Sequence, residues 1–177
     1  MTTRCAMPGP AGRRPRSLVV GLGNPLRRDD ALGLAVAAEL AQRTGADVVG
    51  GPLCGLALLD HMAGYDRLIV VDSVRTGADA PGTVRRIDLG EAAPAEPGSG
   101  RHGLGIAAAL QLGRTAGVAV PGRAVVYTME AADLSGWGEG LSEPVARAVP
   151  DMVRRILCEQ FRGQAGAGAG AGGIGHA

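Results

Sequence analysis

The chain alternates between short apolar runs and longer segments in which apolar residues recur every three or four positions. The first pattern predicts β-strands and the second predicts amphipathic helices. Predicted strands occupy residues 18–20, 46–49, 67–74, 82–88 and 123–129, and predicted helices occupy residues 29–40, 56–62, 101–117 and 142–161. Because helices separate most of the strands, we expect an α/β fold with a mostly parallel sheet. Segment 82–88 follows a short turn and alternates apolar with polar residues, so it is predicted as an antiparallel edge strand.

The stretch SLVVGLGNPLRRDDALG, residues 17–33, joins a buried strand, a glycine turn and the start of a helix. Its first two glycines are typical of a dinucleotide-binding turn, but the third glycine of that motif falls on Leu26. Asp29 and Asp30 would also repel a phosphate from the helix N-terminus, and they suit a cation instead. We expect Asp29 to cap the helix, whereas a capping role and a functional role both stay open for Asp30.

Three further candidates lie at the ends of predicted elements: Asp72 ends an apolar strand, His102 begins a helix, and Glu130 follows the last strand. Each has a structural alternative, as a turn former, a surface or capping residue, and a loop carboxylate respectively. Ligands of open α/β sheets bind where the parallel strands end, so Asp30, Asp72 and His102 are expected to converge at one edge. Two carboxylates and an imidazole can bind a divalent transition metal and leave positions open, which favours metal-assisted hydrolysis.

Other notable side chains occur in glycine-rich loops. Cys54 lies in the loop GGPLCGL of residues 50–56, where no local base or cation would activate it, so we expect a buried or incidental thiol. Trp137, the only tryptophan, either packs over the rim of the sheet or contacts a protein substrate. Ser142 is predicted to cap the last helix, and Glu130 either supports the site or only shapes a loop.

The composition narrows the function classes. The chain has 177 residues, enough for one domain with its own core, and a formal net charge of +1 with 2% aromatic residues. Nucleic-acid binding is disfavoured, because the chain offers neither a basic field nor a set of stacking side chains. Three widely spaced cysteines form no disulfide or zinc pattern and indicate a reducing compartment. No apolar stretch is long enough to span a bilayer.

The two ends of the chain differ in composition from the segment between them. Residues 1–16 are basic and rich in proline and glycine, and the next apolar run is too short for a secretory signal, so we expect a disordered leader. Residues 163–177 are a Gly/Ala repeat, which predicts a flexible tail. The expected folded domain therefore spans residues 17–162.

Four motifs, taken in order, resemble those of the hydrogenase maturation endopeptidases. They are GLGNPLRRDDALG, then LIVVDSV with APGTV behind it, then His102 followed by GLGIAAAL, and finally GLSEPV. The resemblance extends from about residue 18 to about residue 157, and the order and spacing of the motifs make it more specific than any one of them. It implies a three-layer αβα fold of the phosphorylase/hydrolase-like type, in which a twisted, mostly parallel five-stranded sheet with one antiparallel strand lies between helices.

The resemblance also implies a cytoplasmic endopeptidase that removes a short C-terminal extension from the nickel-loaded large-subunit precursor of a [NiFe] hydrogenase. It implies that the precursor supplies the nickel, and we expect no organic cofactor. From the charge and composition above we expect no nucleic-acid or membrane partner, and we expect a monomer while leaving the oligomeric state open. The family's metal-binding and catalytic roles fall on Asp30, Asp72 and His102. The chain departs from many relatives at Ala31, where they have glycine, and from several at Asp30, where they have glutamate. It also lacks the threonine that often contributes to substrate choice, since its loop reads GGPLCG.

Two other functions stay open at this point. The opening LVVGLGNP is also similar to that of peptidyl-tRNA hydrolase, but that family continues with a tyrosine and a histidine-bearing T-R-H-N segment, where this chain has LRRDDALG. The second alternative is a metallochaperone or assembly scaffold that binds the precursor and cuts nothing. For an endopeptidase, the nickel either polarises the scissile carbonyl or activates a water, or it only makes cleavage conditional on a filled site.

Overall fold

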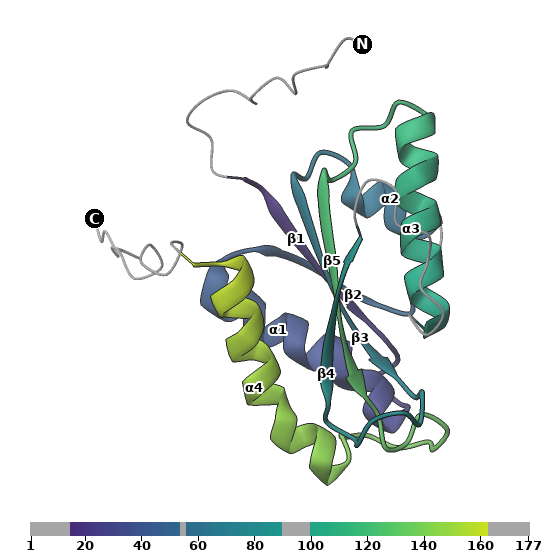
Figure 1. Ribbon diagram of the computed structural model, residues 1–177, viewed down its shortest axis with the longest axis vertical. Helices are drawn as coiled ribbons and strands as arrows, with labels where there is room; N and C mark the ends of the chain where they lie inside the picture. The colour runs from purple at the N-terminus through teal and green to yellow at the C-terminus, as the bar shows by residue number, and fades with distance from the viewer. Residues whose placement is uncertain (1–14, 54–55, 90–99, 163–177) are drawn as a thin grey trace, which may run out of the picture.

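A five-stranded sheet forms the centre of the molecule in the computed structural model, which describes residues 15–53, 56–89 and 100–162 (Figure 1). The strand order is β2-β1-β3-β5-β4. All neighbours pair in parallel except β4, which lies antiparallel to β5 at one edge. The strands are β1 (Ser17–Leu22), β2 (Asp47–Gly51), β3 (Arg67–Val74), β4 (Val84–Leu89) and β5 (Arg123–Glu130). The predicted mixed sheet with its antiparallel edge strand is confirmed.

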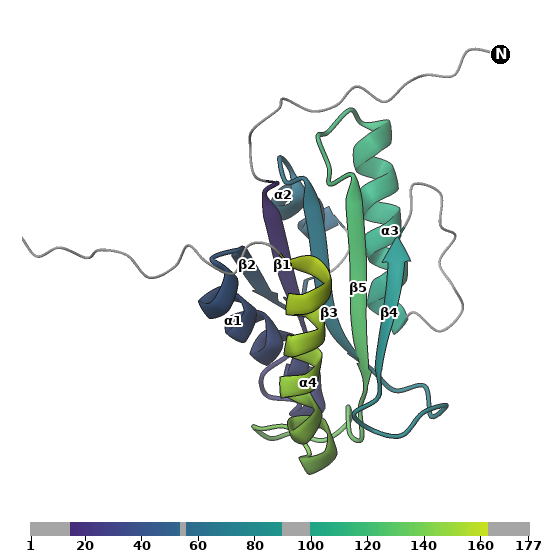
Figure 2. The ribbon, with the colours of Figure 1, turned by 60° about the vertical axis from the view of Figure 1, so that its left-hand side comes forward.

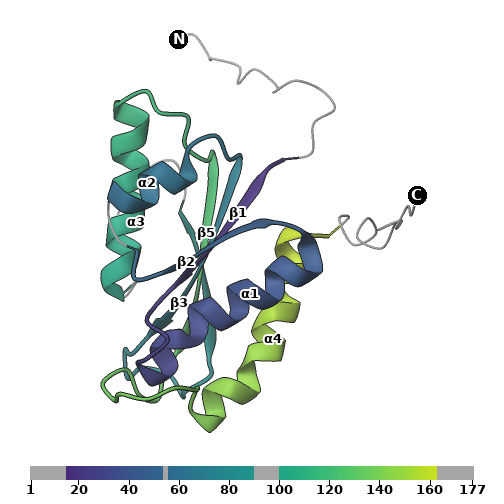
Figure 3. The same cartoon turned by 180° about the vertical axis from the view of Figure 1, so that it is seen from behind.

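Helices cover both faces of this sheet (Figures 1 and 2). The helices α1 (Leu32–Thr44) and α4 (Glu143–Gln160) lie on one face, while α2 (Leu56–Met62) and α3 (Gly100–Thr115) lie on the other (Figure 3). Successive side chains of β3 pack into the two layers in turn. Ile69 and Val71 join the core under α1 and α4, whereas Leu68 and Val70 join the core under α2 and α3. The predicted three-layer αβα architecture is therefore confirmed.

Some of the expected segments lie outside the described residues. These are residues 1–14 of the predicted leader, residues 54–55 with Cys54, residues 90–99, and the predicted tail at residues 163–177. Within the described ranges, no helix combines the length and the apolar character that crossing a membrane requires.

The first predicted helix begins differently from expectation. Arg28–Ala31 form a 3-10 turn, η1, and the α-helical geometry of α1 starts only after it. Arg28 has a φ of 46°, which a non-glycine residue rarely adopts and which separates the preceding loop from this tighter turn. The N-cap of α1 is Ala31, and no side chain caps it. The expectation that Asp29 caps this helix is therefore wrong, and so is the capping alternative for Asp30.

The start of α1 lies directly against the ends of β1 and β3. A Cβ atom on Gly33 would lie 2.2 Å from the carbonyl oxygen of Leu22 and 2.5 Å from that of Val71. A Cβ atom on Gly21 would lie 2.3 Å from the carbonyl oxygen of Gly33. Since neither position has room for a side chain, these two glycines allow the helix and strand backbones to touch. The contact holds η1 where β1 and β3 end.

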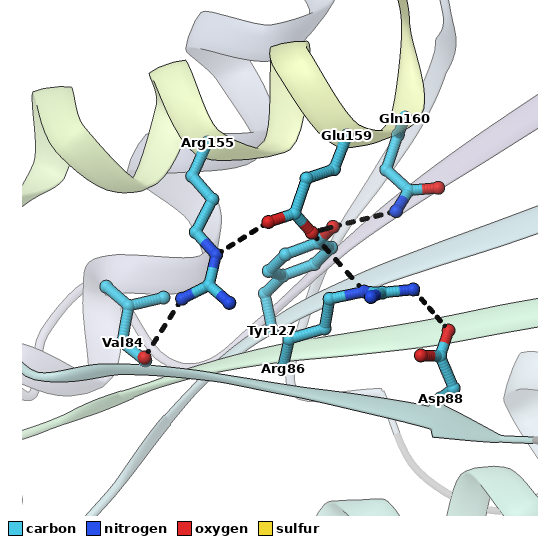
Figure 4. Close-up of polar contacts among 7 residues, drawn as sticks. All are labelled: Val84, Arg86, Asp88, Tyr127, Arg155, Glu159 and Gln160. Atoms are coloured by element: carbon cyan, nitrogen blue, oxygen red, sulfur yellow. Dashed lines mark hydrogen bonds and ion pairs between the residues drawn. The ribbon is translucent and has the colours of Figure 1, made fainter.

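A polar network attaches α4 to the β4–β5 edge of the sheet (Figure 4). Tyr127 donates its hydroxyl proton to Glu159 at 2.8 Å and accepts a hydrogen bond from Gln160 at 2.7 Å. Glu159 also pairs with Arg155 at 2.8 Å and with Arg86 at 3.3 Å. Burial raises the pKa of Tyr127 to about 12. Burial alone would also raise the pKa of Glu159, but hydrogen bonds from Arg155 and Tyr127 and the two guanidinium charges lower it overall.

Candidate active site

The parallel strands β1, β3 and β5 end together, toward the lower end of Figure 1. We call this end of the sheet the carboxyl edge. The loop after α3 meets the turn before β3, where Gly64 N–H donates to the carbonyl oxygen of Ala119 at 2.8 Å. The end of α3 thus lies where the parallel strands begin, and α3 runs antiparallel to β5. The beginning of α3 therefore lies toward the carboxyl edge. Ligands of open α/β sheets bind in this place.

Asp30 lies in η1, partly exposed, where β1 has just ended. Its Oδ2 accepts a hydrogen bond from Asn24 N–H at 2.9 Å. A Cβ atom on Gly23 would lie 1.7 Å from the carbonyl oxygen of Asp30, and Gly23 has a φ of 134°, so only glycine fits there. The second oxygen, Oδ1, accepts no hydrogen bond from the described residues. The carboxylate is thus held by one oxygen and has the other available for a ligand.

Asp72 lies near the carboxyl end of β3 and is only 3% exposed. Its Oδ1 accepts a hydrogen bond from Ser73 N–H at 2.8 Å, and its register partner on β5 is Thr128. Because side chains alternate along a strand, Asp72 shares its face of the sheet with Val70, which packs in the layer of α2 and α3. Asp72 is therefore a buried carboxylate on the α3 side of the carboxyl edge.

His102 is the third residue of α3, so the predicted helix beginning around this histidine is confirmed for the backbone. The side chain of His102 is outside the described part of the chain. The structure thus brings Asp30 and Asp72 to one edge and directs the start of α3 toward it, while contact between the imidazole and the carboxylates stays a prediction. Among the side chains that are described, no three histidine, cysteine, aspartate or glutamate residues form a group that could hold a metal ion.

Asp29 has a structural role that depends on distant partners. It is fully buried, and its Oδ2 accepts hydrogen bonds at 2.9 Å from the N–H groups of Ala132 and Asp133 and from the Ser142 hydroxyl. Its Oδ1 accepts a hydrogen bond from Ser142 N–H at 2.7 Å. Ser142 is the N-cap residue of α4, as predicted, but its hydroxyl donates to Asp29 and makes no cap hydrogen bond to its own helix. Asp29 therefore joins η1 to the loop after β5 and to the start of α4.

Glu130 is likewise bound to neighbouring backbone. Its Oε1 accepts hydrogen bonds from the N–H groups of Thr76 and Gly77, and its Oε2 accepts one from the Thr76 hydroxyl, all at 2.7 Å. These contacts fix the turn that follows β3. Of the two alternatives for Glu130, the loop carboxylate is the one that these contacts support.

One feature beside Asp30 was missed by the sequence analysis. The loop that contains Trp137 pairs with the turn before η1, where Gly138 N–H donates to Leu26 and Arg28 N–H donates to Gly138, both at 3.0 Å. Trp137 is 74% exposed, so the alternative in which it packs over the rim of the sheet is wrong. Backbone pairing between two irregular loops leaves no periodic pattern by which the sequence could have indicated it.

Comparisons with known proteins address the family directly. A family model described as hydrogenase maturation protease matches residues 34–159. The matched range includes Asp72 and His102 and begins after Asp30. The hydrogenase expression/formation protein HupD of Rhizobium leguminosarum bv. viciae is 31% identical over 152 residues, which cover 81% of this chain and 73% of that protein.

Two Escherichia coli proteins are similar as well. The hydrogenase 2 maturation protease of strain K12 is 37% identical over 73 residues, and this match spans 39% of the present chain and 44% of that relative. The solved structure of the hydrogenase maturating endopeptidase HybD is 28% identical, with a TM-score of 0.70 over 83% of this chain and 93% of that chain. The sequence match and the shared fold thus point to one family.

Proposed function

The chain belongs to the hydrogenase maturation protease family, and from this membership we propose that it removes a C-terminal extension from the nickel-loaded large-subunit precursor of a [NiFe] hydrogenase. The observation that carries the proposal is the position of Asp30 and Asp72 at the carboxyl ends of adjacent parallel strands. The nickel belongs to the precursor and is therefore part of the substrate.

In this proposal, Asp30, Asp72 and His102 bind the nickel of the precursor. Carboxylate oxygens and a neutral imidazole are ordinary ligands of a divalent transition metal. The imidazole of His102, at the start of α3, would bind the metal through a neutral ring nitrogen. Asp30 is supported by the hydrogen bond from Asn24, which orients its carboxylate before the precursor arrives.

The proposed reaction is hydrolysis of one peptide bond. The oxygen of a water adds to the scissile carbonyl carbon, the carbon–nitrogen bond breaks, and the products are a shortened precursor with a new carboxylate and a released peptide with a new amino group. Nickel held at the carboxyl edge contributes in one of two ways: it acts as a Lewis acid on the carbonyl or the water, or it only positions a correctly filled precursor.

The test is incubation of the purified protein with nickel-loaded and nickel-free precursor, followed by mass measurement of each product. We expect loss of a C-terminal peptide from the loaded form alone. The Asp30→Asn variant should leave the loaded precursor intact, whereas Asp151→Asn, which changes an exposed carboxylate of α4, should cleave it normally. Tight binding that depends on nickel and yields no shorter product would contradict the endopeptidase and favour an assembly scaffold.

A further inference from the structure

The turn before η1 and the loop after β5 together present an apolar surface next to Asp30. Arg27 and Gly138 form an isolated parallel bridge that holds the two loops side by side. Leu26 and Trp137 flank this bridge, and they are 52% and 74% exposed. Large apolar side chains that are exposed together commonly mark an interaction site. We call Leu26, Arg27 and Trp137 the Leu26–Trp137 patch.

Arg27 gives this patch an unpaired positive charge. Its guanidinium carbon lies 5.7 Å from the centroid of the Trp137 ring, which is a cation–π distance. Its Nε is buried and has no hydrogen-bond partner among the described residues, and no described carboxylate lies within ion-pair distance of it. A buried donor without a partner is unfavourable for the fold. The described part of the fold thus supplies no carboxylate for Arg27, and its positive charge would attract one from a partner.

Arg67 forms a similar arginine–aromatic pair, but its guanidinium also has hydrogen-bond acceptors within the fold. The guanidinium of Arg67 also lies 5.7 Å from the centroid of an aromatic ring, that of Phe161. Unlike Arg27, it donates to the Ser17 hydroxyl at 3.1 Å and to the Gln160 carbonyl oxygen at 2.6 Å. Arg67 therefore has its partners within the fold, whereas Arg27 has a ring beside it and a free hydrogen-bond donor.

We propose that the Leu26–Trp137 patch is the docking surface for a segment of the precursor in which a large apolar side chain lies next to an acidic side chain. This inference rests on the proposed function. The charge of Arg27 selects the carboxylate, and Leu26 and Trp137 bury the apolar side chain. The patch is continuous with the candidate site, because Asp30 N–H donates to the Arg27 carbonyl oxygen at 2.9 Å. A segment bound there approaches the carboxyl edge from the side of Asp30.

Trp137 allows docking to be observed separately from cleavage, since it is the only tryptophan of the chain. Protein labelled with 5-fluorotryptophan has one ¹⁹F resonance, and unlabelled nickel-loaded precursor adds none. We expect the resonance to shift when this precursor binds. A resonance that stays unchanged while the precursor binds would overturn the proposal. A shift that depends on the concentration of the labelled protein alone would also overturn it, because a second copy of the chain would then cover the patch.

Variants of the patch separate docking from chemistry. We expect Trp137→Ala and Arg27→Gln to raise KM for the nickel-loaded precursor about 10-fold or more, as is typical of tryptophan and arginine at interface centres, with kcat unchanged. Arg27→Lys, which keeps the charge, should lose less than Arg27→Gln. The control is Leu112→Ala, which removes an exposed leucine of α3 outside the patch and should leave KM unchanged.

The two measurements distinguish failure of docking from failure of the proposed function. If the wild-type protein cleaves the precursor and the folded patch variants keep the wild-type KM, the docking surface is wrong and the endopeptidase stands. If the precursor shifts the ¹⁹F resonance of the wild-type protein, the patch variants weaken that binding and no cleavage occurs, the docking surface stands and the endopeptidase is wrong.

Discussion

Asp29 and Asp30 are adjacent in the chain but belong to two different regions of the molecule. Asp29 lies in the joint between η1, the loop after β5 and α4, where both of its oxygens accept hydrogen bonds. Asp30 lies at the carboxyl edge, where Asn24 N–H binds one oxygen and the described residues leave the other without a donor. The carboxylate of Asp29 thus holds three segments together, whereas the carboxylate of Asp30 has one oxygen available for a ligand.

Burial alone does not distinguish a carboxylate that holds the fold together from one at the candidate site. Glu130 and Asp72 are equally buried, at 3% exposure, and both lie near strand ends. Three hydrogen bonds from Thr76 and Gly77 occupy the two oxygens of Glu130. To bind a cation, such a carboxylate would first have to give up bonds that hold the turn after β3. We therefore expect substitutions in the joint to change stability and substitutions at the edge to change cleavage.

The largest expected effect is that of Asp29→Ala on stability. Removing this buried carboxylate leaves four partly buried donors of Ala132, Asp133 and Ser142 without their acceptor, which should lower the free energy of unfolding by about 3–5 kcal/mol. Urea unfolding measures the loss. Asp151→Ala, in an exposed position on α4, should change little. An Asp29→Ala protein as stable as this control would show that the joint does not depend on Asp29.

Asp30→Asn should have the opposite effects: a large loss of cleavage and little change in stability. If Asp30 binds the precursor's nickel, the variant should cleave nickel-loaded precursor at least about 100-fold more slowly, because it loses an anionic metal ligand. Its free energy of unfolding should change by less than about 1 kcal/mol, since the amide oxygen can still accept the hydrogen bond from Asn24. Rates from single-turnover cleavage and stabilities from urea unfolding give the two values. A strongly destabilised variant would place Asp30 in the joint instead.

Glu130→Ala tests whether a second carboxylate near the edge behaves like Asp29. Loss of its three hydrogen bonds should reduce the free energy of unfolding by about 2 kcal/mol. The cleavage rate per folded molecule should stay the same, because Glu130 acts on the turn after β3 and not on the precursor. A selective loss of cleavage in a fully folded variant would move Glu130 into the site.

The smallest effect is a pH dependence of stability in the α4 network, far from both aspartates. Burial raises the pKa of Tyr127 to about 12, above its value of about 10 in the unfolded chain. The folded state therefore holds this proton more tightly, so the stabilisation is complete below pH 10 and is lost as the pH rises toward 12. Thermal unfolding between these pH values should show the decrease, and Tyr127→Phe should reduce it. An equal decrease in the variant would assign it to other groups.

The regular elements could be predicted because their signals are local. The predicted strand 67–74 and the predicted helix 56–62 coincide with β3 and α2, and the predicted strand 123–129 is one residue shorter than β5. A buried apolar run bounded by turn residues can be recognised as a strand without information from the rest of the chain. The position of Asp72 at a strand end was predictable for the same reason.

The roles of the polar residues were less predictable, because their partners lie far away in sequence. Asp29 was expected to cap its own helix, but it accepts hydrogen bonds from Ser142, at the start of α4. The bridge between Arg27 and Gly138 brings together two loops that lack any hydrophobic period. Contacts of this kind depend on the finished fold, and a pattern within a short window does not contain them.

The most direct test of the account is the affinity of the protein for nickel-loaded and nickel-free precursor, measured for the wild-type protein and for Asp30→Asn. We predict that the wild-type protein prefers the loaded form by about 10-fold or more, at least the factor that loss of an outer-shell partner costs a metal site, and that Asp30→Asn, which keeps Asp72 and His102, loses most of that preference. A folded Asp30→Asn protein that keeps the full preference for the loaded precursor would contradict the assignment of Asp30 to the nickel.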